Sequence, residues 1–283
     1  MGDPTPAPGL GGLASRVIDE HQLRRIAVVT SHTTGNPALG TLDLSATELA
    51  LVVQTPAPVP GMPTGPTSLA LAEFQPWHGS VDLVILDPFH TYDASVDGIL
   101  SAASLVRPGG LLLVHDCLPP PELISPEFMP GSWCGVTFAA FRDLCAGNGL
   151  AWFTVSNDFG IGAARVPAGG ITAVPVDDAW TADNHPKYLR RYLDDPYAMM
   201  RAVAAHDAMA AIDALMRDQS VDPLLQGFAG WDPALVDIFD SADRTAAGWR
   251  DTAQENEQLR QEAQRLADLD AEQRRDTARE MEQ

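Results

Sequence analysis

Cysteine is scarce in this sequence, and its scarcity excludes a protein stabilised by disulfides. The 283 residues contain 3 Cys, namely Cys117, Cys134 and Cys145, and no two of them form a Cys-x-x-Cys pair. An odd number of cysteines without regular spacing does not build a disulfide framework. The sequence therefore predicts a protein of a reducing compartment, the cytoplasm.

Basic residues are also few. Lys and Arg together number 18 against 38 Asp and Glu, which gives a formal net charge of -20 at pH 7. A surface with this excess of negative charge repels the phosphate backbone of DNA and RNA. We therefore expect no nucleic-acid partner.

Long apolar runs are absent as well. No window approaches the run of about 18 apolar residues that a membrane-spanning helix requires, so we expect no membrane span. The N-terminal stretch MGDPTPAPGLGGLASRV has no basic region followed by an apolar one, as a secretory signal would. With 45% hydrophobic and 20% charged residues, the composition suits a soluble globular protein.

Strand and helix patterns alternate along the first part of the chain. Near-continuous apolar runs predict buried strands at residues 24–31, 49–54, 81–87 and 111–116. Apolar residues at helical spacing predict helices at residues 67–74, 94–106 and 135–149. Two further runs are joined by the short turn Asn-Asp-Phe-Gly, and so predict an antiparallel hairpin over residues 151–156 and 161–166.

These patterns predict an α/β fold, a Rossmann-like three-layer sandwich with a mostly parallel sheet. A C-terminal antiparallel hairpin closes the sheet and supplies one reversed edge strand, and a helical tail follows. We place a flexible arm at residues 1–14 and the α/β domain at residues 15–170. A helical extension is expected at residues 171–240 and one long polar helix at residues 241–283.

The last predicted helix carries only a thin apolar seam. Asn256, Leu259, Ala263 and Leu266 fall at the a and d positions of roughly two heptads. This pattern indicates a weak coiled coil or a solvent-exposed helix. We expect the protein to form a homo-oligomer, or to bind a protein partner, through this helix.

Chemically active side chains follow the two middle strands. Asp87 ends one predicted strand, His90 follows three residues later, and Asp116 ends the next strand. Ligands of open α/β sheets bind outside the carboxyl ends of the strands, so neighbouring strands would bring these residues into one crevice. There the two carboxylates can hold a divalent cation or orient a hydroxyl, and His90 can accept a proton. The structural alternative is that each Asp only caps a helix or forms a turn.

Residues 82–166 resemble the class I S-adenosylmethionine-dependent methyltransferases, in particular the branch that methylates hydroxyls of small molecules and sugars. That branch reads D-x-D-H-S-Y, a helix, L-R-P-G-G, and an apolar strand ending in H-D or D-D. This chain has DPFHTYD, LVRPGG and LLLVHD in the same order. Its segments CGVTFAAFRDL and FGIGAARV are similar to the Gly-Val-containing helix and the closing hairpin of the family.

The resemblance implies methyl transfer from S-adenosylmethionine to a hydroxyl of a small molecule or saccharide. It implies that His90 is the base and that Asp116 orients the acceptor or a cation. The residues implied to bind the cofactor are Thr34, Gly35, Gln54 and Asp87. Mg²⁺, if the site uses a metal, would be held by Asp87 and Asp116.

The sequence departs from the family pattern at three places. The segment VVTSHTTGNPALG has no acid where the first strand of the family ends in one, and Gln54 stands where an acid would end the second strand. Phe89 replaces the second acid of D-x-D-H. These departures favour an alternative function, a catalytically inactive methyltransferase-like scaffold whose helical tail mediates assembly with a partner.

Other candidates for function are weaker. Trp133, Trp152 and Trp180 can line a substrate pocket or simply pack in the core. Cys117 follows His115 and Asp116, which suggests a cysteine nucleophile. Adjacent residues on an extended backbone point to opposite faces, so we do not expect His115 to cooperate with its neighbours.

Overall fold

The structure is a computed structural model, and it describes residues 8–31, 36–54, 72–129, 133–174 and 180–228. Among these residues the helices are α1 (Leu10–His21), α3 (Tyr92–Leu105), α4 (Thr137–Gly147), α5 (His185–Asp194), α6 (Pro196–Met200) and α7 (Ala208–Met216). The strands are β1 (Arg25–Thr30), β2 (Leu49–Gln54), β3 (Val81–Asp87), β4 (Val106–Val114), β5 (Trp152–Val155), β6 (Ile161–Arg165) and β7 (Ala202–Val203). None of these described helices has both the length and the hydropathy needed to cross a membrane.

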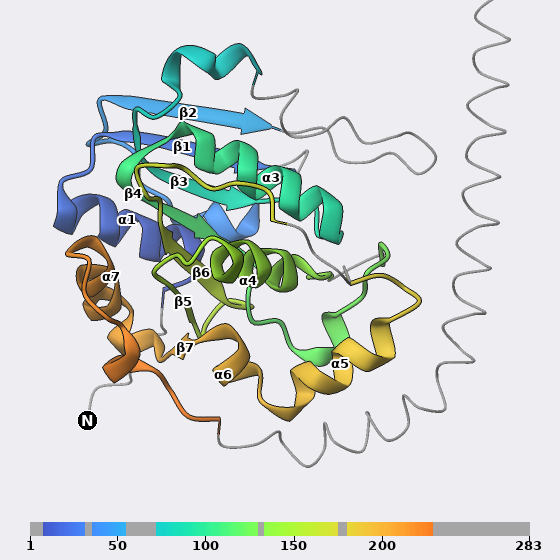
Figure 1. Cartoon of the computed structure of the whole chain (residues 1–283). Coiled ribbons are helices and arrows are strands. Elements are labelled where there is room, and N and C mark those ends of the chain that lie inside the picture. The colour runs from blue at the N-terminus through green and yellow to red at the C-terminus, as the bar shows by residue number, and fades with distance from the viewer. Residues whose placement is uncertain (1–7, 32–35, 55–71, 130–132, 175–179, 229–283) are drawn as a thin grey trace, which may run out of the picture. The chain divides into compact units, whose positions relative to one another are not determined.

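The described strands form one sheet in the order β2-β1-β3-β4-β6-β5-β7 (Figure 1). The first four are mutually parallel, β6 is antiparallel to both of its neighbours, and β7 is parallel to β5. The predicted fold class, a mostly parallel α/β sheet with a C-terminal antiparallel hairpin, is confirmed. The expected position of the reversed strand at the edge is wrong, because the reversed strand β6 lies between β4 and β5.

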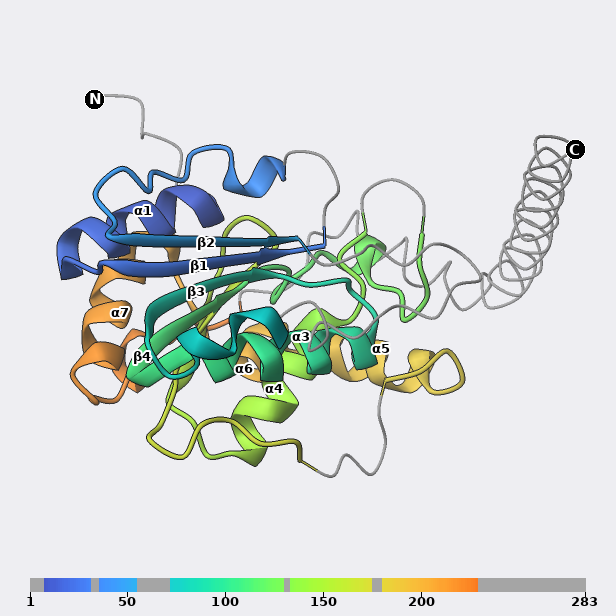
Figure 2. The same ribbon diagram turned by 90° about the horizontal axis from the view of Figure 1, so that it is seen from above.

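Helices cover both faces of the sheet. Figure 2 shows α1 on one side of β1, β2 and β3, and α3 and α4 on the other side. Since side chains alternate along a strand, each strand contributes to two apolar layers. Leu83 and Ile85 of β3 belong to one buried cluster with Leu13 of α1 and Ile212 of α7. The intervening residues of β3 face α3, which completes the three layers.

The Arg-Pro-Gly-Gly segment belongs to β4. Helix α3 ends at Leu105, and β4 begins at the next residue. A Cβ on Gly110 would lie 2.8 Å from the carbonyl oxygen of Asp82 on β3, so only glycine allows the two strands to approach this closely. At the other end of the two strands Leu86 pairs with Val114, so Asp116, two residues after β4, lies beside Asp87 at the end of β3.

The C-terminal part of the described chain is joined to the sheet. β7 extends the sheet beyond β5, and α7 covers the same face as α1. The hydroxyl of Tyr192 on α5 donates to the carbonyl oxygen of Pro119 at 2.7 Å, which anchors α5 to the segment that follows Asp116. The extension predicted from residue 171 therefore contributes a strand and a covering helix to the α/β domain.

Some predicted segments have other boundaries or lie elsewhere. Helix α1 begins at Leu10, within the predicted arm of residues 1–14, and Leu10 and Leu13 are buried. Of the helix predicted at residues 67–74, the described part belongs to the 3₁₀ helix Ala72–Trp77. The chain divides into two units, and the second, residues 58–64 with 229–283, lies outside the described residues. The predicted coiled coil falls within this second unit.

Candidate functional site

Asp87 lies where the connections of the sheet change direction. β1 and β3 are neighbours, and Thr30 at the end of β1 pairs with Asp87 at the end of β3. The chain passes from β1 to β2 on one side, but from β3 to β4 on the other side. Ligands of open α/β sheets bind outside the carboxyl ends of the strands at such a point. Asp87 therefore occupies the place where this fold binds ligands.

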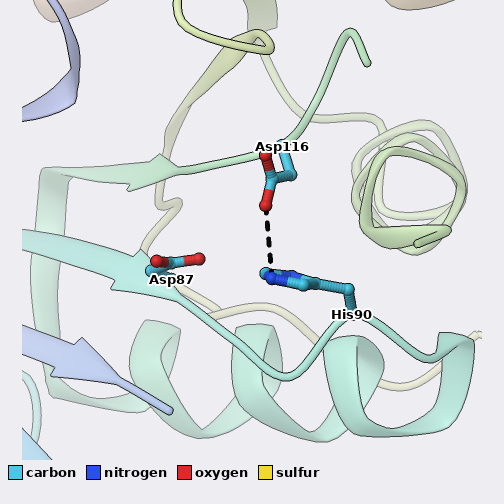
Figure 3. Close-up of side chains that lie close together, drawn as sticks. All are labelled: Asp87, His90 and Asp116. Atoms are coloured by element: carbon cyan, nitrogen blue, oxygen red, sulfur yellow. Dashed lines mark ion pairs between the residues drawn. The ribbon is translucent and has the colours of Figure 1, made fainter. Parts of the chain in front are cut away.

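Three of the residues singled out in the sequence come together at this edge, and their side chains point toward one another (Figure 3). His90 lies on the loop between β3 and α3, and its Nε2 lies 3.4 Å from Oδ2 of Asp116. One nitrogen or oxygen atom from each of Asp87, His90 and Asp116 lies within 4.8 Å of the others. All three residues are buried. The expected proximity of the carboxylates and the imidazole is thus observed.

The backbone of Asp116 brings two consecutive side chains into the same cluster. Strand pairing continues to His115, whose N–H donates to the carbonyl oxygen of Leu86 at 2.9 Å. Asp116 then adopts a left-handed conformation with φ 58°, which ends the alternation of side chains along the strand. As a result, Nδ1 of His115 lies 3.5 Å from Oδ1 of Asp116. The expectation that the side chains of His115 and Asp116 point to opposite faces is therefore wrong.

His115 is the site residue that the sequence reading missed. Its Nδ1 also lies 3.7 Å from Oδ1 of Asp87, and its Nε2 lies 3.4 Å from Oδ2 of Asp158. Only 8% of the side chain is exposed, so the ring lies buried among three carboxylates. His115 could have been predicted from the His-Asp pair at the end of the strand. Nothing in the sequence distinguished Asp158 from other turn residues.

The electrostatics of the cluster follow from this arrangement. Burial alone would lower the pKa of His115, but the carboxylates of Asp158, Asp87 and Asp116 overcome that effect and raise the pKa to about 11. Burial raises the pKa of Asp116 above its ordinary value, against the opposing charges of His90 and His115. The contact with His115 and the N–H of Leu10 hold the pKa of Asp158 below its ordinary value, although burial opposes them. The raised pKa of His115 favours its protonated form, which offsets part of the negative charge of the three carboxylates.

The ring of His90 is oriented from its other side by hydroxyl groups. Its Nδ1 lies 3.4 Å from Oγ1 of Thr137, which in turn lies 3.1 Å from Oγ of Ser95. The backbone of His90 is also fixed, because its carbonyl oxygen accepts the N–H of Val136 at 2.8 Å. A Cβ on Gly135 would overlap that carbonyl, so this approach requires glycine. His90 is thus held between Thr137 and Asp116.

Aromatic rings surround His90 on the side of the β3–α3 loop. The ring centroid of Trp133 lies 5.3 Å from that of His90, and Phe89 and Phe128 both contact Trp133 at 5.1 and 5.3 Å. Phe128 is 45% exposed, so this cluster reaches the surface. Of the three tryptophans considered in the sequence, Trp133 alone contacts a site residue here. Trp152 and Trp180 pack against Phe141 and Phe138 of α4, and are core residues.

The predicted cofactor-binding residues are only partly placed. Thr34 and Gly35 lie outside the described residues. The backbone of Gln54 ends β2, as predicted. Asp87 has a partner that the sequence did not suggest, because Nδ2 of Asn36 donates to its Oδ2 at 2.5 Å and also to Oγ1 of Thr30 at 3.3 Å. The loop after β1 therefore contacts the end of β3.

No family model and no curated protein matches the sequence. An O-methyltransferase family protein from Burkholderia thailandensis matches with 20% identity and a TM-score of 0.32, over 58% of this chain and 50% of that chain. A "possible exported protein" from Bordetella parapertussis matches with 17% identity and a TM-score of 0.33, over 56% and 67% of the two chains. A protein from Corynebacterium glutamicum matches with 12% identity and a TM-score of 0.32, over 62% and 94%. The chain thus spans half the length of the O-methyltransferase it matches, and similarity this distant assigns no activity.

Proposed function

We propose that this protein transfers a methyl group from S-adenosylmethionine to a hydroxyl of a small molecule or saccharide. The observation that carries the proposal is the buried pair of His90 and Asp116, with Nε2 and Oδ2 3.4 Å apart, beside Asp87 at the ligand-binding edge of the sheet. The motif order shared with the methyltransferase family supports the same reaction. The O-methyltransferase found among similar folds agrees with it but adds no independent weight.

The role of the chain in this reaction is to align the hydroxyl and to take its proton. S-adenosylmethionine, when bound, supplies a methyl group on a positively charged sulfur. The hydroxyl would bind beside His90 and Asp116, within reach of both Nε2 and Oδ2, which lie 3.4 Å apart. His90 and Asp116 would take the proton of the hydroxyl as its oxygen accepts the methyl group that the cofactor would supply. Thr137 keeps the His90 ring in place during the transfer.

The cofactor side is proposed to include Asp87, Thr34, Gly35 and Gln54. Asp87 is proposed for this role because it ends β3 at the change in sheet direction. It is only 2% exposed, so the cofactor would have to replace Asn36 or His115 as a partner of its carboxylate. Asn36, which donates to the same carboxylate, fixes its orientation. We therefore expect Asp87 to hold polar groups of the cofactor.

Mg²⁺ does not fit the cluster as it stands. The ion prefers oxygen ligands in octahedral geometry, and Asp87 and Asp116 are the residues that would supply them. Each of their four carboxylate oxygens already faces a nitrogen, from His90, His115 or Asn36. Binding a metal would require these nitrogens to move away. The raised pKa of His115 favours a positive charge beside Asp87 and Asp116, which further disfavours a cation at this position.

The acceptor is proposed to lie against the aromatic rings beside His90. The exposed face of Phe128 suits an apolar or planar part of a small molecule. The carboxylates of Asp87, Asp116 and Asp158 disfavour an anionic acceptor by charge repulsion. A neutral hydroxyl compound with an apolar body fits both features.

A second candidate function is an inactive methyltransferase-like scaffold that binds a partner through the C-terminal segment. One observation favours it: β1 is followed by Ser31 and β2 ends in Gln54, so neither strand supplies a carboxylate for the cofactor. In this case the cluster of Asp87, His90 and Asp116 would only stabilise the sheet edge.

Calorimetric titration with S-adenosylhomocysteine separates the two functions. We expect binding to the wild type, loss of binding in Asp87→Asn, and retained binding in Asp82→Asn. Asp82 is a matched control because its carboxylate lies at the opposite end of the same strand and accepts the N–H groups of Arg24 and Arg25 at 2.9 Å. Absence of both heat and thermal shift in the wild type at millimolar ligand would favour the scaffold.

A further inference from the structure

The turn between β5 and β6 is built around left-handed residues. Asp158 and Phe159 have φ of 51° and 58°, and Gly160 has φ of 89°. Positive φ at both central residues is what a type I′ hairpin turn requires, and the carbonyl oxygen of Asn157 accepts the N–H of Gly160 at 2.9 Å to close it. The turn places the side chain of Asp158 beside the end of β4.

The turn is bonded to the chain segment that follows Asp116. The carbonyl oxygen of Gly160 accepts the N–H of Cys117 at 2.8 Å, and that of Phe159 accepts the N–H of Leu118 at 2.7 Å. A Cβ on Gly160 would overlap the backbone nitrogen of Leu118. The position of Asp158 relative to the end of β4 is therefore fixed by backbone contacts.

Asp158 is also held by the N-terminus of α1. Its Oδ2 accepts the N–H of Leu10, the first residue of this 12-residue helix, at 2.7 Å. The partial positive charge at a helix N-terminus stabilises a carboxylate there. The neighbouring Asn157 donates through Nδ2 to the carbonyl oxygen of Pro8 at 2.9 Å, which adds a second contact between turn and helix. Asp158 is thus a rigid acceptor that faces His115.

His115 connects this acceptor to the proposed catalytic pair. Its Nε2 faces Asp158, and its Nδ1 faces Oδ1 of both Asp87 and Asp116, at 3.7 and 3.5 Å. Two carboxylates in one buried site repel each other, and a donor between them sets their separation. Fixing the ring of His115 therefore also fixes the carboxylate of Asp116 that faces His90.

We infer that His115 and Asp158 are positioning residues of this site, where Asp158 orients the His115 ring and His115 holds the carboxylates of Asp87 and Asp116. The inference rests on the proposed methyl transfer for its effect on rate, but the contact between the two residues is testable without turnover. Neither residue touches the reacting atoms. Their effect on the reaction is exerted through Asp116.

The first test observes the contact itself. Long-range ¹H–¹⁵N spectra of the histidine rings would be recorded for the wild type, Asp158→Asn and Asp82→Asn, with His115→Gln to assign the signal. Oδ2 of Asp158 faces both the N–H of Leu10 and Nε2 of His115, so asparagine removes the charge but leaves an oxygen for the turn. We expect a slowly exchanging Nε2 proton of His115 that exchanges faster in Asp158→Asn, where the neutral amide is a weaker acceptor, and is unchanged in Asp82→Asn. An unchanged Nε2 signal in Asp158→Asn would overturn the inference.

The second test measures kcat and KM with tritiated S-adenosylmethionine and the best acceptor among catechol, phenol and methyl glucoside. Because small misplacements near a reacting group slow it strongly, we expect kcat of Asp158→Asn to fall roughly tenfold to a hundredfold. Both KM values and S-adenosylhomocysteine affinity should stay near those of the wild type. If Asp158 acts only through His115, kcat of the double variant Asp158→Asn with His115→Gln should be no lower than kcat of His115→Gln alone.

The results separate the inference from the function on which it rests. A wild type that neither binds S-adenosylhomocysteine nor methylates an acceptor refutes the proposed function, while the ring spectra still decide the contact. Additive losses of kcat in the double variant, or an equal loss in Asp82→Asn, would show a general structural effect and overturn the positioning role.

Discussion

Nε2 of His90 lies 3.4 Å from Oδ2 of Asp116, although one residue precedes α3 and the other follows β4. The opposite nitrogen of the ring faces Thr137 at 3.4 Å. Both nitrogens therefore have protein partners, so in the proposed reaction the proton would be accepted by His90 and Asp116 together. A buried imidazole and carboxylate in this relation are typical of general base catalysis.

Replacing His90 tests this pair. Because a positioned base contributes about 10²- to 10⁴-fold to a rate, His90→Ala should lower kcat by that range. The affinity for S-adenosylhomocysteine should be unchanged, since the cofactor is expected beside Asp87. His206→Ala is the control, because that side chain is 83% exposed. Full activity of His90→Ala in the methyl-transfer assay would remove His90 from the mechanism.

Metal removal tests the charge balance of the site. Because nitrogens already face all four carboxylate oxygens of Asp87 and Asp116, we expect turnover to be the same with a chelator or with added Mg²⁺. The measurement is kcat after dialysis against chelator, with metal content checked by atomic absorption. Loss of activity that Mg²⁺ restores would show that His90 or His115 moves to admit an ion.

The sheet was largely predictable from the sequence. Continuous apolar runs of strand length predicted β2 and β3 with their observed bounds. The reason holds for β3, whose residues are nearly all buried, whereas β2 was wrongly expected to be buried: it is an edge strand, and its Val52 is 67% exposed. The order of the strands requires pairing information that periodicity does not contain. The two-residue strand β7 was missed for this reason, since it is defined only by its pairing with β5.

The candidate site was predictable only in part. Asp87, His90 and Asp116 were found because they follow apolar strands, and strand ends meet at one edge of a parallel sheet. His115 was set aside on the assumption that the backbone stays extended through Asp116. The left-handed conformation of Asp116 and the long-range contact with Asp158 are tertiary features that no local pattern in the sequence specifies.

The aromatic cluster gives a prediction about the acceptor. Phe128→Ala removes an exposed ring that contacts Trp133 but not His90 directly. We expect KM for the acceptor to rise severalfold, with kcat and thermal stability nearly unchanged. Val52→Ala on β2 is the control, because Val52 is also exposed, at 67%, and lies on the edge strand. An unchanged acceptor KM would show that the rings serve only to pack the loop.

Two glycines with positive φ give a prediction about stability. Gly160→Ala should lower the free energy of unfolding by about 4 kcal/mol or more, because its Cβ would overlap the backbone of Leu118. Gly149→Ala has a similar backbone conformation but no atom within 4 Å of the new Cβ, and should lose only about 1–2 kcal/mol. Urea denaturation measures both losses. Equal losses would mean that the β5–β6 turn is not fixed against the end of β4.

The raised pKa of His115 predicts how stability depends on pH. The pKa is about 11 in the folded protein and about 6.5 in the unfolded chain, so the folded state retains this proton more tightly. The resulting stabilisation is complete below pH 6.5 and decreases as the pH rises toward 11, by at most about 1.4 kcal/mol per unit. His115→Gln lacks this contribution, so its free energy of unfolding should fall less steeply than that of the wild type between about pH 6.5 and pH 8.5. His206→Gln, altered at an exposed histidine, should keep the wild-type slope. Parallel curves for the wild type and His115→Gln would mean that the ring is neutral and that the carboxylates share protons instead.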